Sequence, residues 1–306
     1  MDNPFTQTNL YGLENQFNSL KVLYDNKKLP NKILFVGEKG LGKFTLSLHL
    51  INYILSKGED NCYDIENFKI NENNTSYKLV KNNSSPNLYL IDLLKDKKNI
   101  EIDQIRELIS FCNKTSLNNK PRFILIDNLE LMTLNSNNAL LRTLEEPNND
   151  IYFILISNSR KILPTISSRC LKFNINLTQK ECLNIFNKIT NIHINDLINS
   201  ELISYYFSTG DLLNLYRFSI DNSIDLSKLS LKELLLKIID ENFYKKESIS
   251  KNLIYAFIQM YFLKNLNIEI NYETYVKIIN SIENVKKYNL DIESFFIQLR
   301  HQLIND

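Results

Sequence analysis

Short apolar runs alternate with segments of helical apolar spacing along the first half of the chain. This alternation is typical of β-α-β units, which build a parallel sheet. Strands are expected at 32–37, 87–92, 122–128 and 151–158, with a short fifth at 171–173. Helices are expected at 44–55, at 102–112 with Asp103 as N-cap, and at 136–147 with Ser136 as N-cap.

Beyond about Thr178 the strand signals vanish, and the apolar residues keep helical spacing to the end of the chain. One helical cluster reaches about Asn222, and a second covers the rest. The pattern therefore predicts an α/β nucleotide-binding-type domain with a parallel sheet at 1–174. A small helical domain is expected at 175–222, and a carboxy-terminal all-helical domain at 223–306.

Residues 57–85 show neither the strand pattern nor the helical pattern. Asn, Lys, Asp, Glu and Ser dominate this stretch. Such a composition predicts a surface excursion with weak structure, placed between the first predicted helix and the second predicted strand.

The composition narrows the function only by exclusion. Of 306 residues, 43% are hydrophobic and 23% are charged, and 36 basic residues against 35 acidic ones give a net charge of +1. This balance argues against a surface dedicated to coating nucleic acid. The most apolar segment, 252–266, has about ten apolar positions, whereas a membrane span needs roughly 20. The amino terminus has no signal pattern and the four cysteines are widely spaced, so a cytoplasmic location is expected.

The stretch "GEKGLGKFT", residues 37–45, has the pattern of a phosphate-binding loop with one substitution. Such a loop follows a strand, turns its backbone N–H groups toward phosphates and opens a helix. Lys43 takes the place of the lysine that reaches the outer phosphates. The next position normally carries a hydroxyl that binds Mg²⁺, and here it carries Phe44. Thr45 lies about 100° further round the helix and is poorly placed to substitute.

The end of the third predicted strand also departs from a working site. An acid there usually supports Mg²⁺, and in many ATPases the next residue is a glutamate that polarises the attacking water. Asp127 fits the first role, but Asn128 cannot accept a proton, and a missing general base costs about 10²- to 10⁴-fold in rate. The loop is thus either an inherited turn or a working loop with unusual metal ligation. The residues of this degenerate nucleotide site are Gly37, Gly40, Gly42, Lys43, Phe44, Thr45, Asp127 and Asn128.

Two further motifs make the relationship specific. The third predicted helix ends in Leu-Glu-Glu-Pro, and the fourth predicted strand is followed by Leu-Pro-Thr-Ile-Ser-Ser-Arg-Cys at 163–170. Together with the loop and the "RFILIDNLE" strand, these motifs resemble the clamp-loader branch of the AAA+ family, and within it the bacterial DNA polymerase III delta prime subunits. The resemblance covers the first domain well and the helical remainder weakly. It implies an AAA+ (RecA-like) domain, a helical lid domain and an all-helical collar domain.

The resemblance also implies roles for individual positions. Arg169 of the Ser-Arg-Cys motif is expected to project into the ATP site of a neighbouring subunit and to act there as an arginine finger. Ser157 and Asn158 lie where relatives sense the γ-phosphate. The arginine that active relatives carry after a glycine turn is absent after Gly210. Many relatives hold a four-cysteine zinc module, but only Cys62 lies in that region here, so zinc is not expected.

The function implied by the resemblance is that of a clamp-loader subunit that does not hydrolyse ATP. No cofactor of its own is expected, because neighbouring subunits of gamma/tau type would hold ATP and Mg²⁺. With them and a delta subunit, the chain would help to load a sliding clamp on primed DNA. No contact with a membrane is expected. Two alternatives stay open: an active ATPase motor subunit of gamma/tau type, and a phosphate-loop kinase, which would leave the two further motifs unexplained.

Overall fold

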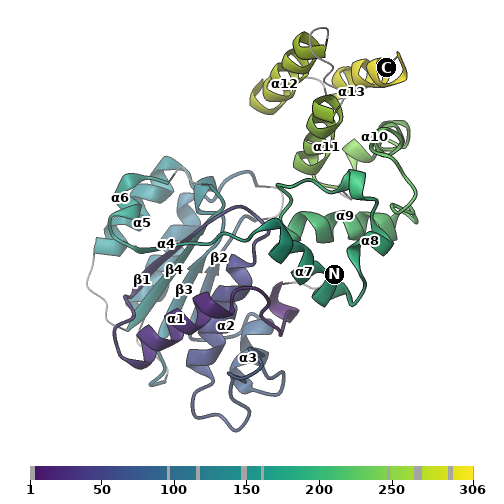
Figure 1. Ribbon diagram of the computed structural model, residues 1–306. Helices are drawn as coiled ribbons and strands as arrows, with labels where there is room; N and C mark the ends of the chain where they lie inside the picture. The colour runs from purple at the N-terminus through teal and green to yellow at the C-terminus, as the bar shows by residue number, and fades with distance from the viewer. Residues whose placement is uncertain are drawn as a thin grey trace. The chain divides into compact units, whose positions relative to one another are not determined.

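The computed structural model of the chain describes residues 4–94, 97–114, 118–145, 150–159, 162–246, 249–264, 271–288 and 292–305. The chain divides into two compact units, Met1–Glu181 and Cys182–Asp306, which Figure 1 shows in a purple-to-teal and a green-to-yellow range. The predicted division of the helical part into two domains at residue 222 stays a prediction.

The first unit is built on a five-stranded, wholly parallel sheet with the order β2-β3-β4-β1-β5. The strands are buried apolar runs, as parallel sheets covered on both faces require, and every residue of β3 is buried. All five predicted strands are present. They are β1 (Lys32–Val36), β2 (Leu88–Ile91), β3 (Arg122–Ile126), β4 (Ile151–Ser157) and β5 (Leu171–Asn174).

Helices cover both faces of this sheet (Figure 1). Helices α4 and α5 pack on one face, where a buried cluster joins Leu108 and Leu140 to strand residues such as Ile124 and Phe153. Helices α1 and α2 cover the other face. The elements are η1 (Pro4–Thr6), α1 (Glu14–Asp25), α2 (Lys43–Leu55), α3 (Thr75–Lys81), α4 (Ile102–Asn113), η2 (Leu129–Leu131), α5 (Leu134–Glu145) and α6 (Pro164–Ser167).

Both predicted N-caps are wrong by two or three residues. Helix α4 is capped by Glu101, whose backbone N–H donates to the side-chain oxygen of Gln104 in a capping box, and Asp103 lies in the first turn. Helix α5 begins two residues before Ser136, and the hydroxyl of Thr133 accepts from the N–H of Ser136. In both helices the capping residue precedes the first turn, and its side chain accepts a hydrogen bond from a free N–H of that turn.

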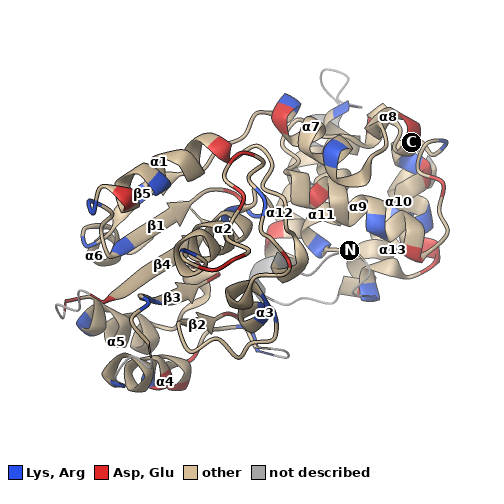
Figure 2. Cartoon of the chain, turned by 90° about the horizontal axis from the view of Figure 1, so that it is seen from below, with Lys and Arg blue, Asp and Glu red and all other residues tan. Residues whose placement is uncertain are grey.

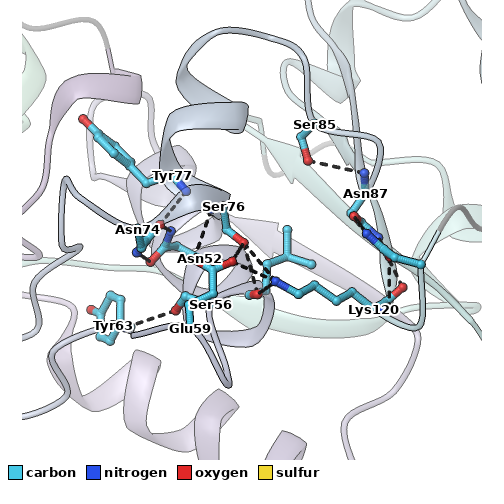
Figure 3. A network of polar contacts seen from close by, with 12 residues as sticks. Asn52, Ser56, Glu59, Tyr63, Asn74, Ser76, Tyr77, Ser85, Asn87 and Lys120 are labelled. Carbon is cyan, nitrogen blue, oxygen red and sulfur yellow. Dashed lines mark hydrogen bonds and ion pairs between the residues drawn. The ribbon is translucent and has the colours of Figure 1, made fainter. Parts of the chain in front are cut away.

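The segment 57–85 is more ordered than its composition predicts. It contains α3, whose N-cap Asn74 exchanges hydrogen bonds of 3.2 Å with Asn52 of α2. Lys120, far along the chain, donates to Glu59 at 2.8 Å, and Glu59 accepts from Ser76 at 2.6 Å (Figure 3). Polar residues therefore hold this segment to α2 and to the start of β3, and the expectation of weak structure is wrong.

The second unit consists of helices joined by loops, with no strand among its described residues. A single hydrophobic cluster, from Phe186 to Leu303, joins its helices. No helix in the described part of the whole chain is long and apolar enough to span a membrane. Lys and Arg residues are interspersed with Asp and Glu residues over both units (Figure 2). The helices are α7 (Gln179–Thr190), which begins at the junction, α8 (Ile194–Leu197), η3 (Ser200–Leu202), α9 (Thr209–Asp221), α10 (Leu231–Asp240), η4 (Phe243–Lys245), α11 (Lys251–Lys264), α12 (Asn271–Tyr288) and α13 (Ile292–Asn305).

Candidate functional site

The candidate site lies where the strands of the first unit end. Carboxyl ends of parallel strands meet at one edge of a sheet, and ligands of open α/β sheets bind outside that edge. Here the edge presents Gly37 after β1, Asp92 after β2, Asp127 after β3 and Asn158 after β4. Most of the residues predicted for the nucleotide site are therefore brought together by the sheet.

The glycines of the loop are required by its backbone. A Cβ atom on Gly37 would lie 2.2 Å from the carbonyl oxygen of Ile175, which is backbone and cannot yield. Gly40 and Gly42 have φ angles of 84° and 80°, in the left-handed region that glycine tolerates best. Gly42 is also the N-cap of α2, so the loop retains the strand-turn-helix shape of a phosphate-binding loop.

Lys43 is buried inside its own loop. Its ammonium group donates to the carbonyl oxygen of Gly37 at 2.9 Å and to that of Glu38 at 2.5 Å. Burial lowers the pKa of Lys43 to about 8, against the opposing influence of Asp127 and Glu130. The lysine therefore satisfies its hydrogen bonds within the protein, where a phosphate-binding lysine would donate to phosphate oxygens.

The position after the lysine serves packing. The ring of Phe44 meets that of Phe5 edge to face, with ring centroids 5.4 Å apart, and so fastens the amino-terminal segment to α2. Thr45 is half-buried, and the hydroxyl of Ser47 donates to the carbonyl oxygen of Lys43 at 2.9 Å. Because no hydroxyl stands at residue 44, this loop does not fit Mg²⁺ held in the usual way.

Asp127 is the acid most affected by its surroundings. Its pKa is raised to about 6, chiefly by burial. The nearby acids Asp92 and Glu130 also raise it, whereas the N–H of Asn128 and the charge of Lys43 lower it. The N–H of Asn128 lies 2.8 Å from the carboxylate of Asp127. An acid with so perturbed a pKa is typical of functional sites, and also occurs in structural ion-pair networks.

Asn128, the residue after Asp127, links three strand ends. Its φ of 53° lies in the left-handed region, which asparagine tolerates better than most residues. Its side-chain amide donates to Asp92 at 2.7 Å, and its side-chain oxygen accepts from Asn158 at 2.9 Å. The amide therefore ties the ends of β2, β3 and β4 together and has no proton-accepting group to offer a water molecule.

Glu130 also contacts the end of β4. Its carboxylate accepts from the N–H of Asn158 at 2.9 Å and from the hydroxyl of Ser157 at 3.3 Å. The contacts of Glu130 and Asp92 were not predicted from the sequence. For Asp92 the available signal was its place at the end of the strand "NLYLID". Glu130 and Ser157 border an open pocket of about 480 Å³, and no residue of 37–45 lines it. Its lining residues are Leu129, Glu130, Asn137, Ser157, Ile162, Leu163 and Ile166.

Arg169 lies two residues after α6 and is separate from this network. Its side chain is 34% exposed and forms an ion pair with Glu145 at 2.6 Å. Its second terminal nitrogen donates to the carbonyl oxygen of Thr165 at 2.8 Å. Glu146 and Pro147 of the Leu-Glu-Glu-Pro motif lie outside the described residues. The arginine is therefore on the surface of its unit, fixed at two points and still reachable from solvent.

Two smaller predictions concern the surroundings of the site. Within the described ranges, no group of three or more His, Cys, Asp or Glu side chains could hold a metal ion, and Cys62 is exposed as a free thiol. In the second unit, Asp211 stands shortly after Gly210 and forms a capping box with Ser208 at the start of α9. That position therefore serves the helix end.

Known proteins are similar to this chain in sequence and in fold. A family model described as "DNA polymerase III, delta subunit" matches residues 12–179. A DNA polymerase III subunit delta' of Bacillus subtilis is 32% identical over 157 residues, which are 49% of this chain and 44% of the relative. A DNA polymerase III subunit gamma of Buchnera aphidicola is 39% identical over 93 residues, 30% of this chain and 25% of the relative. The chain thus spans less than half the length of either of these relatives.

The solved structures extend the comparison to the fold. A DNA polymerase III gamma subunit-related protein of Thermotoga maritima matches with a TM-score of 0.56, at 18% identity, over 93% of this chain and 98% of that chain. At that identity the match shows the fold alone. The predicted fold class, an AAA+ parallel-sheet domain followed by helical parts, is confirmed, as is the resemblance to delta prime subunits. Because the family model matches more than half of its residues, the chain belongs to the DNA polymerase III delta subunit family.

Proposed function

We propose that this chain is a delta prime-type clamp-loader subunit of DNA polymerase III that supplies Arg169 in trans and does not hydrolyse ATP. The observation that carries the proposal is a contrast within the first unit. Its own loop has no metal-binding hydroxyl at residue 44, and Asn128 stands at the position of the base. Arg169, in contrast, is exposed and fixed at two points.

The chemistry of a guanidinium suits the proposed task. It stays charged at any physiological pH and can donate to two phosphate oxygens at once. Placed beside an ATP held by a neighbouring subunit, it would stabilise the charge that develops on the transferred phosphoryl group, an effect worth about 10³ to 10⁵ in rate at that site. ATP and Mg²⁺ would belong to the neighbour, and this chain's loop would serve as a structural turn.

The partners follow from the same proposal. Relatives named gamma and tau/gamma match this chain alongside those named delta'. We infer that the chain assembles with motor subunits of gamma/tau type and with a delta subunit in the bacterial cytoplasm. The sliding clamp and primed DNA would be met through the assembled complex. The balanced charges of each unit agree with DNA contact that is shared with partners (Figure 2).

A second candidate function is that of an active ATPase motor subunit. The match to a gamma subunit favours it, as does the retention of Lys43 and Asp127 at one edge of the sheet. It requires a ligand for Mg²⁺ other than residue 44 and a base other than Asn128. The two candidates differ in one simple property, which is ATP turnover by the chain alone.

The test is ATPase activity, stimulated by clamp and primed DNA, in a reconstituted loader. Arg169→Ala is compared with the unchanged chain. Arg106→Ala is the matched control, because Arg106 is also exposed and also ion-paired, to Asp103 at 2.8 Å on α4. The isolated chain is assayed in parallel.

Under the proposal the isolated chain is inactive, and Arg169→Ala lowers turnover in the assembly by roughly 10-fold or more while Arg106→Ala does not. Turnover by the isolated chain, abolished by Lys43→Ala, would establish the motor-subunit alternative. An assembly that is indifferent to Arg169→Ala would refute the arginine-finger proposal.

A further inference from the structure

Glu145 occupies a position that its helix alone disfavours. It is the last residue of α5, and the carboxyl end of a helix carries a partial negative charge that repels an acid. Its carboxylate lies 2.6 Å from a terminal nitrogen of Arg169, which offsets that repulsion. We propose that Glu145 is a positioning residue, which holds the guanidinium of Arg169 in the orientation that meets a neighbour's phosphate. This inference rests on the proposed function.

The contacts of Arg169 leave it able to act while it is held. The carboxylate of Glu145 accepts a hydrogen bond from one terminal nitrogen of Arg169, and the carbonyl oxygen of Thr165 accepts one from the other. A guanidinium has five N–H donors, so within the part of the chain that the structure describes three remain, including the one on Nε. The planar group is thus fixed at two points and keeps donors for phosphate oxygens.

Fixing an exposed arginine matters because the free side chain samples many rotamers. The side chains of Arg169 and Glu145 are 34% and 55% exposed, so packing alone does not choose a rotamer. Glu145 lies on α5, and Thr165 belongs to α6, so the two anchors come from separate elements. Ordering the group before it meets its target lowers the entropy that must be lost in the transition state.

The experiment uses the reconstituted loader and four variants: Glu145→Ala, Glu145→Gln, Arg169→Ala, and the double variant with both alanines. Asp103→Ala is the matched control, since it breaks another exposed ion pair with an arginine. Assembly is checked by size-exclusion chromatography. The measured quantities are kcat and the KM for ATP of clamp- and DNA-stimulated turnover.

Glu145→Ala is expected to lower the Arg169-dependent kcat by about 2- to 5-fold, the effect of an exposed ion pair, with little change in KM. Glu145→Gln keeps an oxygen that can accept from the guanidinium and should retain most of the activity. It also serves if the alanine variant assembles poorly. The double variant should equal Arg169→Ala, because a positioning residue acts only through the residue it positions.

Three outcomes would overturn the inference and leave the proposed function intact. One is an unchanged kcat in Glu145→Ala beside a reduced one in Arg169→Ala. Another is a raised kcat, which would mean that the carboxylate shields the arginine. The third is a double variant less active than Arg169→Ala, which would mean a structural role. Only an ineffective Arg169→Ala would refute the proposed function itself.

Discussion

Two polar networks of the first unit shift the pKa values of their acids in opposite directions. In segment 57–85, Glu59 accepts hydrogen bonds from Lys120 and from the hydroxyl of Ser76 (Figure 3). Burial alone would raise the pKa of Glu59, but these hydrogen bonds outweigh it, so the pKa is lowered. At the carboxyl edge of the sheet, burial raises the pKa of Asp127 to about 6. The first network stabilises the charged form of Glu59, whereas the surroundings of Asp127 destabilise its charged form.

The difference distinguishes a network that pairs its charges from a cluster of acids at the edge where ligands of open α/β sheets bind. A network that only holds a segment in place can pair every charge. A site evolved for phosphates and Mg²⁺ gathers acids whose natural partner is a metal ion. In this chain the acids Asp92 and Asp127 lie together at the edge, and Phe44 stands where a phosphate-binding loop usually carries a metal-binding hydroxyl. Asn128 links the ends of three strands at this edge.

The largest expected effect tests whether Asn128 is structural. Asn128→Ala loses two hydrogen bonds and places a Cβ-bearing residue without a polar side chain at a φ of 53°. We expect the free energy of unfolding of the first unit to fall by about 3 kcal/mol. The measurement is hydrogen exchange of peptides from β3 and β4, because a chain of two units need not unfold in one step.

Asn128→Gly is the control for the backbone. Glycine tolerates the left-handed conformation, so its cost should be about 2 kcal/mol, the share of the hydrogen bonds alone. If both variants cost less than about 0.5 kcal/mol, the link between the strand ends contributes nothing and the comparison drawn above fails.

Much of this edge could be predicted from the sequence, but not how its side chains pair. The strands were predictable because parallel strands are near-continuous apolar runs, and the glycine loop because its spacing is specific. The links from Asn128 to Asp92 and Asn158 depend on which strands are neighbours, which the strand order decides. The order in segment 57–85 was missed because Lys120 lies 61 residues from Glu59.

The second prediction concerns the cost of Asp127. Its pKa is about 6 in the folded chain and near 3.8 when unfolded, so the folded state binds a proton between these values and the unfolded state does not. Stability should therefore fall as the pH rises from about 4 to about 6, by about 2 kcal/mol. Asp127→Asn removes this titration, and its stability relative to the unchanged chain should grow by that amount over the same range.

The measurement is urea unfolding by circular dichroism at pH 4 and pH 7, combined with a ¹³C NMR titration of the aspartate carboxyls. The resonance that disappears in Asp127→Asn should have a midpoint about two units above that of an ordinary aspartate. A midpoint near 4 would mean that the sheet edge carries no such cost, and the two networks would then be alike.

The smallest effect is expected in segment 57–85, with the opposite sign. The pKa of Glu59 is lowered, so its contribution is fully present above its unfolded pKa and is lost as the pH falls through its folded pKa. At pH 7, Glu59→Gln should cost about 1 kcal/mol, since the half-exposed Lys120 is screened by solvent. As the pH falls through the lowered pKa of Glu59, the variant and the unchanged chain should converge, because both side chains are then neutral. Glu66→Gln, an exposed change in the same segment, is the control and should shift stability at neither pH. A Glu59→Gln variant that is equally destabilised at both pH values would show that the segment is held by packing rather than by charge.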